Sequence, residues 1–166
     1  MTKTSKNRHH VVIIGAGFGG IEVANQLAGA EVDVTIIDRR NHHLFQPLLY
    51  QVAGASLSTS EIAWPIRYLF RNRPEVNTLM AEVEGIDQDA RQVILNNGSR
   101  QTYDTLVLAT GATHAYFGHD EWRAFAPGSK TLEDATTIRR RILPAVQEAE
   151  PTEPSLRSEA VFGLII

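Results

Sequence analysis

The stretch HVVIIGAGFGG, residues 10–20, decides the fold of this chain. Its run Val11–Ile14 is β-branched throughout, which is typical of a strand buried on both faces of a parallel sheet. The strand ends in the glycine turn Gly15–Gly20, which has the spacing G-x-G-x-x-G, and a helix-compatible segment follows. Strand, glycine turn and helix in this order predict an anion-binding turn at a helix N-terminus.

Each glycine of this turn has its own physical role. Gly15 permits the tight turn out of the strand, and Gly17 lets the backbone come close to a pyrophosphate. Gly20 removes a side chain where the helix must touch the sheet. At the start of the helix, unpaired N–H groups and the helix dipole favour negative charge. The turn therefore predicts a site for phosphate groups.

An acidic residue supports the same interpretation. The run VDVTII, residues 32–37, predicts a second strand, and it ends on Asp38, eighteen positions after Gly20. A carboxylate there can accept both hydroxyls of an adenosine ribose and would repel a 2′-phosphate. The alternative is a glycine-rich turn with a solvated aspartate. The complete order of strand, glycines, helix, strand and acid favours a dinucleotide site.

The amino-acid composition and net charge limit the classes of function that this chain can have. The chain has 166 residues, 43% hydrophobic and 21% charged, as expected for one globular domain with a core. A formal net charge of −3 argues against nucleic acid or an anionic membrane surface as partner. The chain contains no cysteine, which removes thiolate catalysis and fits a reducing, cytosolic setting. The adjacent His42 and His43 do not predict a metal site, because neighbouring side chains diverge and no third ligand has matching spacing.

Three features after Asp38 concern packing and charge. The pair Arg39-Arg40 has two interpretations. It contacts a ligand, by neutralising a pyrophosphate or covering an adenine face, or it is the solvated edge of a loop. The segment 44–53 is too apolar for a free loop, so it packs on a planar cofactor ring or on neighbouring helices. The segment 60–70 predicts a short helix with Ser60 as its cap and Pro65 in its early part.

A hairpin and a second glycine turn follow. The segments 91–95 and 99–103 flank Asn96-Asn97-Gly98, and an Asn-Gly pair favours a tight hairpin turn. Together with short extended segments at 76–80 and 81–86, they predict a small antiparallel insert. Residues 104–112, DTLVLATGA, then form a buried strand that ends in Thr110-Gly111. We expect this second turn to lie beside the first and to contact the same ligand.

The C-terminal part predicts a helix, a linker and a strand. Thr131, with Asp134 three residues on, resembles a capping box, and apolar residues then recur every three or four positions. The segment 151–159 is a polar linker, and 160–166 begins another buried strand and stops, as in a truncated chain. Because the incomplete sheet exposes an edge, we expect Val161–Ile166 to pair within the sheet or to exchange between copies, giving a homodimer.

Four stretches of the chain closely resemble the N-terminal FAD-binding part of type II NADH dehydrogenases. These are single-chain NADH:quinone oxidoreductases of the two-dinucleotide-binding-domain flavoprotein group. The stretches are VVIIGAGFGGIEVANQL (11–27), RRNHHLFQPLLYQVA (39–53), TLVLATGATHAYFGHDEW (105–122) and TLEDATTIRRRIL (131–143). The glycine fingerprint and the ATG turn specify only the larger group, whereas FQPLLYQVA and ATHAYFGHDEW carry the resemblance to the family.

The resemblance implies which residues bind FAD. The turn would hold the FAD pyrophosphate, Asp38 the adenosine ribose with Arg39 nearby, and His43 lies where the cofactor loop approaches FAD. Val83 would offer its backbone to the adenine. The implied cofactor-binding residues are Gly15, Ala16, Gly17, Phe18, Gly19, Gly20, Asp38, Arg39, His43, Val83, Ala109, Thr110 and Gly111. No metal-binding or catalytic residue is assigned.

The resemblance also implies a fold and a division of the chain into parts. We expect an α/β fold: a Rossmann-like parallel sheet with helices and a small antiparallel β insert, as in FAD/NAD(P)-binding domains, but truncated. The expected parts are a disordered polar N-terminus (1–9), an FAD-binding Rossmann-like domain (10–128), a connecting helix (129–150), a linker (151–159) and the first strand of a truncated NADH-binding domain (160–166).

In this family, NADH reduces FAD by hydride transfer, and the flavin passes electrons to a membrane quinone. The resemblance thus implies a cytoplasmic protein that is peripheral on the cytoplasmic membrane face when full-length. Its NADH site and its C-terminal membrane contact would lie outside this chain, so we do not expect the fragment alone to be active. The alternatives are the FAD domain of a ferredoxin-reductase-type flavoprotein and a non-catalytic dinucleotide-binding module. The absence of cysteine argues against disulfide reductases and sulfide:quinone oxidoreductases.

Overall fold

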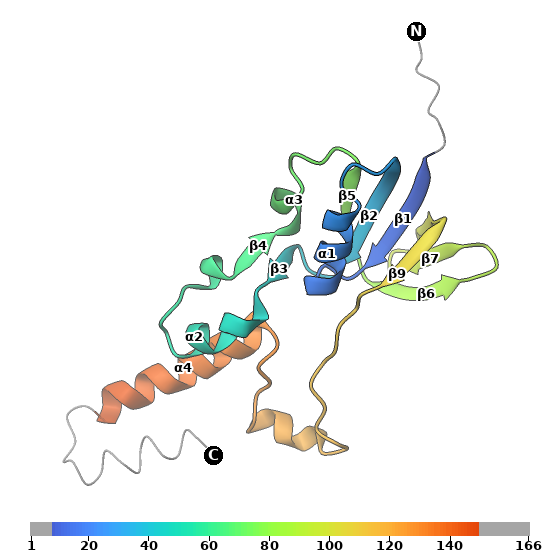
Figure 1. Cartoon of the computed structure of the whole chain (residues 1–166). Helices are drawn as coiled ribbons and strands as arrows, with labels where there is room; N and C mark the ends of the chain where they lie inside the picture. Colours follow the sequence, from blue (N-terminus) through green and yellow to red (C-terminus); the bar gives the residue numbers. More distant parts are fainter. Residues whose placement is uncertain (1–7, 150–166) are drawn as a thin grey trace. The chain divides into compact units, whose positions relative to one another are not determined.

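Four parallel strands form the sheet on which the glycine turn is built. The computed structural model describes residues 8–149. The strands are β1 (His9–Ile14), β2 (Val32–Asp38), β5 (Val76–Met80) and β9 (Thr105–Leu108). Their order is β5-β2-β1-β9, and every neighbouring pair is parallel (Figure 1). This is the Rossmann-like sheet that the sequence predicts, and β1 begins one residue before the expected domain start at residue 10.

The register brings the carboxyl ends of the strands to one edge of the sheet. Ile14 pairs with Ile37 of β2 on one side and with Leu108 of β9 on the other. Asp38 pairs with Met80 at the end of β5. Because ligands of such sheets bind outside the carboxyl ends, the turn after Ile14 lies at the functional edge.

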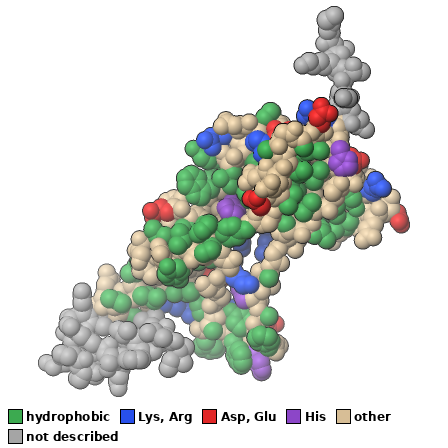
Figure 2. All heavy atoms as spheres, in the orientation of Figure 1, with side chains coloured by type: hydrophobic (Ala, Val, Ile, Leu, Met, Phe, Trp, Pro, Cys, Tyr) green, Lys and Arg blue, Asp and Glu red, His purple; other side chains and the backbone are tan. Residues whose placement is uncertain are grey.

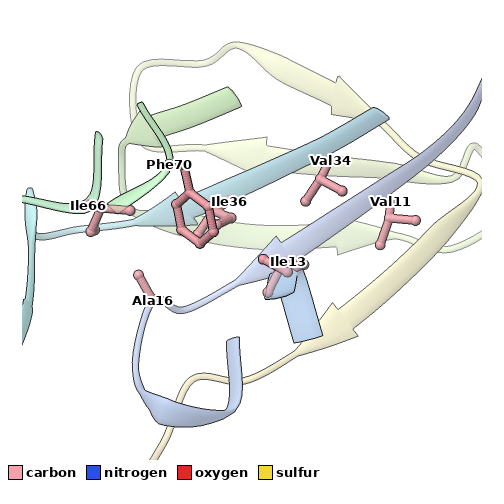
Figure 3. Close-up of a cluster of buried hydrophobic side chains, with 8 residues drawn as sticks. Val11, Ile13, Ala16, Val34, Ile36, Ile66 and Phe70 are labelled. Atoms are coloured by element: carbon pink, nitrogen blue, oxygen red, sulfur yellow. The ribbon is translucent and has the colours of Figure 1, made fainter. Parts of the chain in front are cut away.

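One face of the sheet is covered by α1 (Phe18–Gln26) and α3 (Ile66–Leu69). A cluster of buried side chains joins these elements to the strands (Figure 3), and its members are Val11, Ile13, Ala16, Ala24, Val34, Ile36, Ile66 and Phe70. Alternate strand residues face this cluster because the side-chain period of a strand is two. Burying an aliphatic or aromatic side chain of this size is worth about 1.5–3 kcal/mol relative to leaving it exposed.

The opposite face of the sheet carries the antiparallel insert that the sequence predicts. The segment 76–80, expected in this insert, is instead β5 of the parallel sheet, where it pairs with β2. The strands of the insert are β6 (Val83–Asp87), β7 (Gln92–Leu95) and β8 (Arg100–Thr102), in the order β6-β7-β8. The turn between β7 and β8 contains Gly98 with φ +78°, a conformation that favours glycine. Val93 and Leu95 pack in one buried cluster with Val12 and Ile37 of the parallel sheet.

Contacts divide the chain into two compact units. Within the described residues, the first is 8–43 with 64–112, and the second is 44–63 with 113–149. The parallel sheet and the insert therefore belong to the first unit. The segment 44–63 and the helix after 128, expected in different parts of the chain, both belong to the second unit by contacts.

The second unit is built around two helices. α2 (Leu49–Ala53) follows the short 3-10 helix η1 (Gln46–Leu48) and lies against α4 (Leu132–Ala149), as Figure 1 shows. Its buried core is made by Leu49, Val52, Ala53, Ile62 and Ala135. The apolar segment 44–53, for which the sequence left two alternatives, therefore packs on a neighbouring helix.

The predicted capping box at the start of α4 is confirmed. The Thr131 hydroxyl accepts a hydrogen bond from the Asp134 N–H at 3.0 Å, and the Asp134 carboxylate accepts one from the Thr131 N–H at 3.0 Å. Two backbone donors that helix geometry leaves without partners are thereby satisfied.

Exposed aromatic side chains gather around a short 3-10 helix of the second unit, η3 (Asp120–Ala124). Figure 2 shows hydrophobic side chains over this part of the surface. Phe117 is 91% exposed and Phe125 81% exposed, and Phe117 has φ +54°. The His119 ring stacks on Trp122 with centroids 4.3 Å apart.

The expected helix from Ser60 to Phe70 is wrong. The structure has a 3-10 turn, η2 (Thr59–Glu61), then a strand, β4 (Ala63–Pro65), which pairs with β3 (His42–Leu44), and only then α3. Pro65 lacks an N–H and biases the residue before it toward extended backbone, so the helix begins after the proline. The cap of η2 is Ser58, whose N–H donates to the Glu61 carboxylate at 2.7 Å.

Several expectations lie outside the described residues. They concern most of the N-terminal segment 1–9, the linker 151–159, the strand 160–166 and the exchange of Val161–Ile166. Among the helices between residues 8 and 149, none combines the length and the apolar character needed to cross a membrane.

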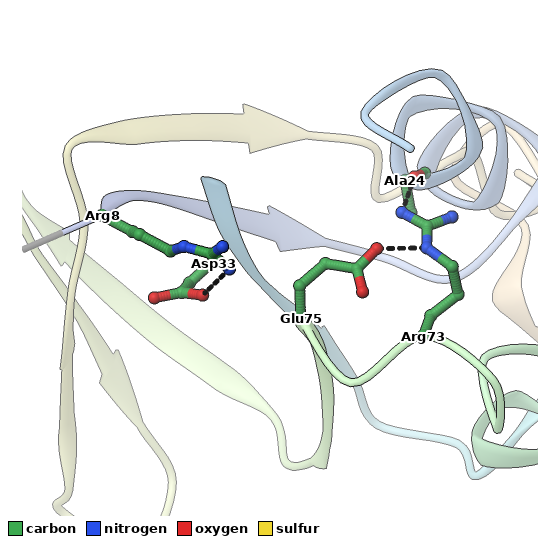
Figure 4. Close-up of polar contacts among 5 residues, drawn as sticks. All are labelled: Arg8, Ala24, Asp33, Arg73 and Glu75. Carbon is green, nitrogen blue, oxygen red and sulfur yellow. Dashed lines mark hydrogen bonds and ion pairs between the residues drawn. The ribbon is translucent and has the colours of Figure 1, made fainter. Parts of the chain in front are cut away.

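Ion pairs lie at the amino-terminal end of the sheet (Figure 4). The Arg73 guanidinium donates to the Glu75 carboxylate and, at 3.2 Å, to the Ala24 carbonyl of α1. Arg8 and Asp33 form a second pair at 3.6 Å. The hydrogen bond from Arg73 holds the pKa of the Glu75 carboxyl below its usual value of 4.5.

This lowered pKa predicts a pH-dependent stability. A carboxylate whose pKa falls on folding adds stability that is complete above its unfolded pKa and is lost as pH drops below it. We expect wild type to exceed Glu75→Gln in unfolding free energy at neutral pH, with a difference that shrinks as pH falls below 4.5. Urea unfolding of both proteins over a series of pH values measures this. A difference that stays constant through the series would contradict it.

Candidate functional site

The glycine turn brings strand, helix and a second turn into backbone contact. Gly15 has φ +104°, and its N–H donates to the Ile37 carbonyl at 2.8 Å. A Cβ on Gly15 would lie 2.2 Å from the Ala109 carbonyl oxygen, and a Cβ on Gly20 would lie 1.8 Å from the Gly15 carbonyl oxygen. Both distances are far below any real contact. The roles predicted for these two glycines are therefore confirmed as steric requirements.

The first turn of α1 faces the sheet edge. The first hydrogen bond of the helix runs from the Ile21 N–H to the Gly17 carbonyl at 3.0 Å, so helix geometry gives the preceding amides of Gly19 and Gly20 no acceptor within the helix. The N-cap, Gly17, has no side chain, and a Cβ there would meet no atom within 4 Å. The first turn contains no acidic residue. This end of α1 is suited to an anion.

Side chains hold the turn at Ala16, which is only 2% exposed. The Ala16 N–H donates to Asp38 Oδ2 at 2.7 Å, and the Ala16 carbonyl lies 2.8 Å from His43 Nδ1. The second oxygen of Asp38 accepts the Arg40 N–H at 2.8 Å. Asp38 therefore joins the end of β2 to the turn after β1 before any ligand is considered.

These hydrogen bonds determine which backbone amides of the turn can still donate to a phosphate. The amides of Gly15 and Ala16 already donate within the protein, so the donors suited to a phosphate are those of Gly17 and of the first turn of α1. Each Asp38 oxygen accepts one backbone N–H and keeps a second lone-pair direction, which leaves capacity for ribose hydroxyls. The sequence motif gives no signal for the bond from His43, because the two partners lie 27 residues apart.

A pocket of about 370 Å³ opens in the first unit beside the ends of β2 and β5. Arg40 and Asn41 line it from the loop after Asp38, and Met80 lines it from β5. The Ala81 N–H donates to the Asp38 carbonyl at 3.0 Å, which holds the segment leading to Val83 at the same edge. Two arginines, Arg40 and Arg67, line the pocket together with apolar residues such as Ile36, so the pocket suits a flat ring with an anionic neighbour. Arg67 carries no motif, and sequence reasoning missed it.

The second glycine turn lies next to the first, as expected. The Ala109 N–H donates to the Ile14 carbonyl at 2.8 Å, and Gly111 has φ +71°. Ala109 is also the residue that leaves Gly15 no room for a Cβ. The backbone of 109–111 therefore forms one wall of the edge at which α1 begins.

The residues present fit a dinucleotide. A Cβ at Gly15 or Gly20 would collide with backbone atoms of the site, whereas a Cβ at Gly17 would meet no atom within 4 Å. An anion-binding helix start, a carboxylate and an apolar pocket follow one another along the edge of one unit. Among residues 8–149, no three His, Asp or Glu side chains gather as metal ligands, and His42 has its own partner, Asn41, at 3.2 Å.

Comparisons with known proteins agree with this geometry. The sequence profile of the pyridine nucleotide-disulphide oxidoreductase family matches residues 9–161. A type II NADH:quinone oxidoreductase of Mycobacterium tuberculosis is 44% identical over 169 residues, which cover 99% of this chain and 36% of that protein. The chain thus spans about a third of the length of this curated relative.

Solved structures show the same fold. NDH2 from Plasmodium falciparum in complex with NADH matches with a TM-score of 0.75 at 26% identity, covering 92% of this chain and 32% of that one. The sulfide:quinone oxidoreductase from Aquifex aeolicus matches with a TM-score of 0.77 at 28% identity, covering 84% and 32%.

The geometry of the turn predicts a large effect of substitution at one glycine and almost none at its neighbour. Gly20→Ala places a Cβ against the Gly15 carbonyl and should lower the unfolding free energy by about 3 kcal/mol, because only backbone can move. Gly19→Ala is the matched control: its Cβ would meet only the Ala109 Cβ, at 3.9 Å, so its effect should stay within about 0.5 kcal/mol. Urea unfolding measures both. Equal effects would refute the steric account of the turn.

Proposed function

This chain belongs to the pyridine nucleotide-disulphide oxidoreductase family, and from that premise we propose that it forms the FAD-binding part of a flavoprotein that oxidises NADH and passes the electrons to a quinone. The observation that carries the proposal is the turn at the start of α1. It combines two positions closed to any Cβ with an open position at Gly17. Such a turn suits the close approach of a diphosphate.

The names of similar proteins support the two substrates. The mycobacterial relative is an NADH:quinone oxidoreductase, and the Plasmodium falciparum NDH2 structure contains NADH. We extend these substrates to the protein that contains this chain. A quinone acceptor places the proposed activity at the membrane, so we expect the full-length protein to be peripheral on its cytoplasmic face.

Within the site, this chain's residues bind and orient. The first turn of α1 offers N–H donors and the positive end of the helix dipole to the diphosphate. Asp38 offers its remaining lone pairs to the ribose, and the pocket beside Arg40 receives the adenine. Arg39 is exposed on the same loop, Val83 offers its backbone to the adenine, and Thr110-Gly111 closes the site. When bound, FAD supplies the hydride-accepting chemistry.

A sulfide:quinone oxidoreductase is the rival that the structural comparison raises. Enzymes that handle sulfide on this plan use cysteine, and the 166 residues of this chain contain none. Over the third of that enzyme's length that this chain spans, the absence of cysteine argues against sulfide as the electron donor. A ferredoxin in place of quinone stays an alternative for the acceptor, and reduction of each by the same holoprotein distinguishes them.

Flavin binding tests the proposal directly. We expect the purified chain to carry flavin or to take it up on titration, with the flavin absorbance bands appearing and with FAD identified by mass after release. A protein that shows no flavin bands and no change in fluorescence after titration with FAD would overturn the proposal.

Asp38→Ala tests the adenosine end. Removing the carboxylate strips hydrogen bonds from the ribose and should weaken FAD binding by about 1–3 kcal/mol. FMN, which lacks the adenosine, is the matched ligand: its affinity should fall less than that of FAD if Asp38 acts on the ribose as well as on the turn. Equal losses for FAD and FMN would show that Asp38 acts only through the Ala16 turn. Isothermal titration of both ligands measures the difference.

A further inference from the structure

We propose that His43 is a positioning residue of this site: it holds the Ala16 carbonyl and thereby turns the Gly17 N–H toward the ligand. The inference rests on the proposed function. Its starting observation is the distance of 2.8 Å between His43 Nδ1 and the Ala16 carbonyl oxygen, in a half-buried setting. Both residues belong to the first unit of the chain.

The acceptor defines the state of the imidazole. A carbonyl oxygen can only accept, so His43 Nδ1 must carry the proton in this bond.

The carbonyl direction determines the direction of the next amide. The peptide bond between Ala16 and Gly17 is planar and trans, since no cis peptide occurs between residues 8 and 149. In a trans peptide the C=O and the N–H point in opposite directions. The Ala16 carbonyl points to His43, so the Gly17 N–H points away from it. Gly17 is exposed, and a Cβ there would meet no atom within 4 Å.

The hydrogen bond from His43 is needed because residue 17 is a glycine. Glycine has wide backbone freedom, so the peptide before Gly17 could rotate at little cost and present its carbonyl oxygen to the open side. An oxygen there would repel a phosphate, whereas an N–H binds it. His43 favours the orientation that binds. Asp38 holds the preceding peptide through the Ala16 N–H, so two side chains fix two successive peptide units.

The ring has a defined place in the fold. The Phe18 side chain, at the start of α1, meets it edge to face, with ring centroids 5.3 Å apart. β3 supplies His43, and its neighbour His42 bonds Asn41 at 3.2 Å instead of the turn. The charged groups near the Ala16 turn are Asp38, which bonds its N–H, and Arg39 and Arg40, which follow Asp38 in the chain.

Three variants of the whole chain separate the hydrogen bond from ring packing. His43→Asn keeps an N–H donor near the position of Nδ1 but loses the ring. His43→Ala loses both, and His42→Ala is the matched control. We expect the FAD dissociation constant to rise about tenfold for His43→Ala, by less than about threefold for His43→Asn and by less than about twofold for His42→Ala. Fluorescence titration with FAD measures all three.

NMR supplies a second readout. We expect 15N NMR of the imidazole to show Nδ1 protonated in the apoprotein. We also expect the Gly17 amide resonance to shift on FAD binding in wild type and in His43→Asn. An Nε2–H tautomer, or His43→Asn as weak as His43→Ala, would overturn the inference.

Different results would overturn the proposed function and the role proposed for His43. A wild-type chain that binds no FAD would overturn the proposed function and this inference with it. A wild-type chain that binds FAD no more tightly than His43→Ala would overturn this inference alone.

Discussion

The structure depends on one backbone contact, where the start of α1 meets the turn that leaves β1. A single added carbon at Gly20 would lie 1.8 Å from the Gly15 carbonyl oxygen. This lack of space brings the first turn of the helix against the edge of the sheet. Its N–H groups and dipole then act at the carboxyl ends of the strands. The phosphate affinity that we propose for this edge is therefore a consequence of backbone packing.

The parallel register extends that contact into a site. Because β2 and β9 are both in register with β1, their ends arrive at the same edge, with Asp38 on one side and Ala109 on the other. Asp38 then bonds the turn through the Ala16 N–H, so the carboxylate that we propose for ribose binding also braces the turn.

Much of this could be predicted from sequence because the signals are local. The glycine spacing, the acid after the second strand, the Asn-Gly hairpin and the Thr131 capping box each lie within a few residues and depend on backbone geometry alone. The family resemblance added the cofactor and the substrates. The family profile and the mycobacterial relative agree with that resemblance.

What sequence could not supply depends on distant partners or on competing local signals. Either Ser58 or Ser60 can cap a helix, and the choice of Ser58 follows from its reciprocal bonds with Glu61 and from Pro65 further on. The packing of α2 on α4 joins segments about 80 residues apart, beyond the reach of periodicity. The bond from His43 to Ala16 likewise crosses 27 residues and leaves no mark in a motif.

The measurement that tests the account most directly is a crystal structure of this chain with FAD. The account predicts diphosphate oxygens within hydrogen-bond distance of the backbone N–H groups of Gly17 and of the first turn of α1, with the adenosine ribose at Asp38. FAD bound elsewhere, with that turn closed by the protein's own atoms, would contradict it.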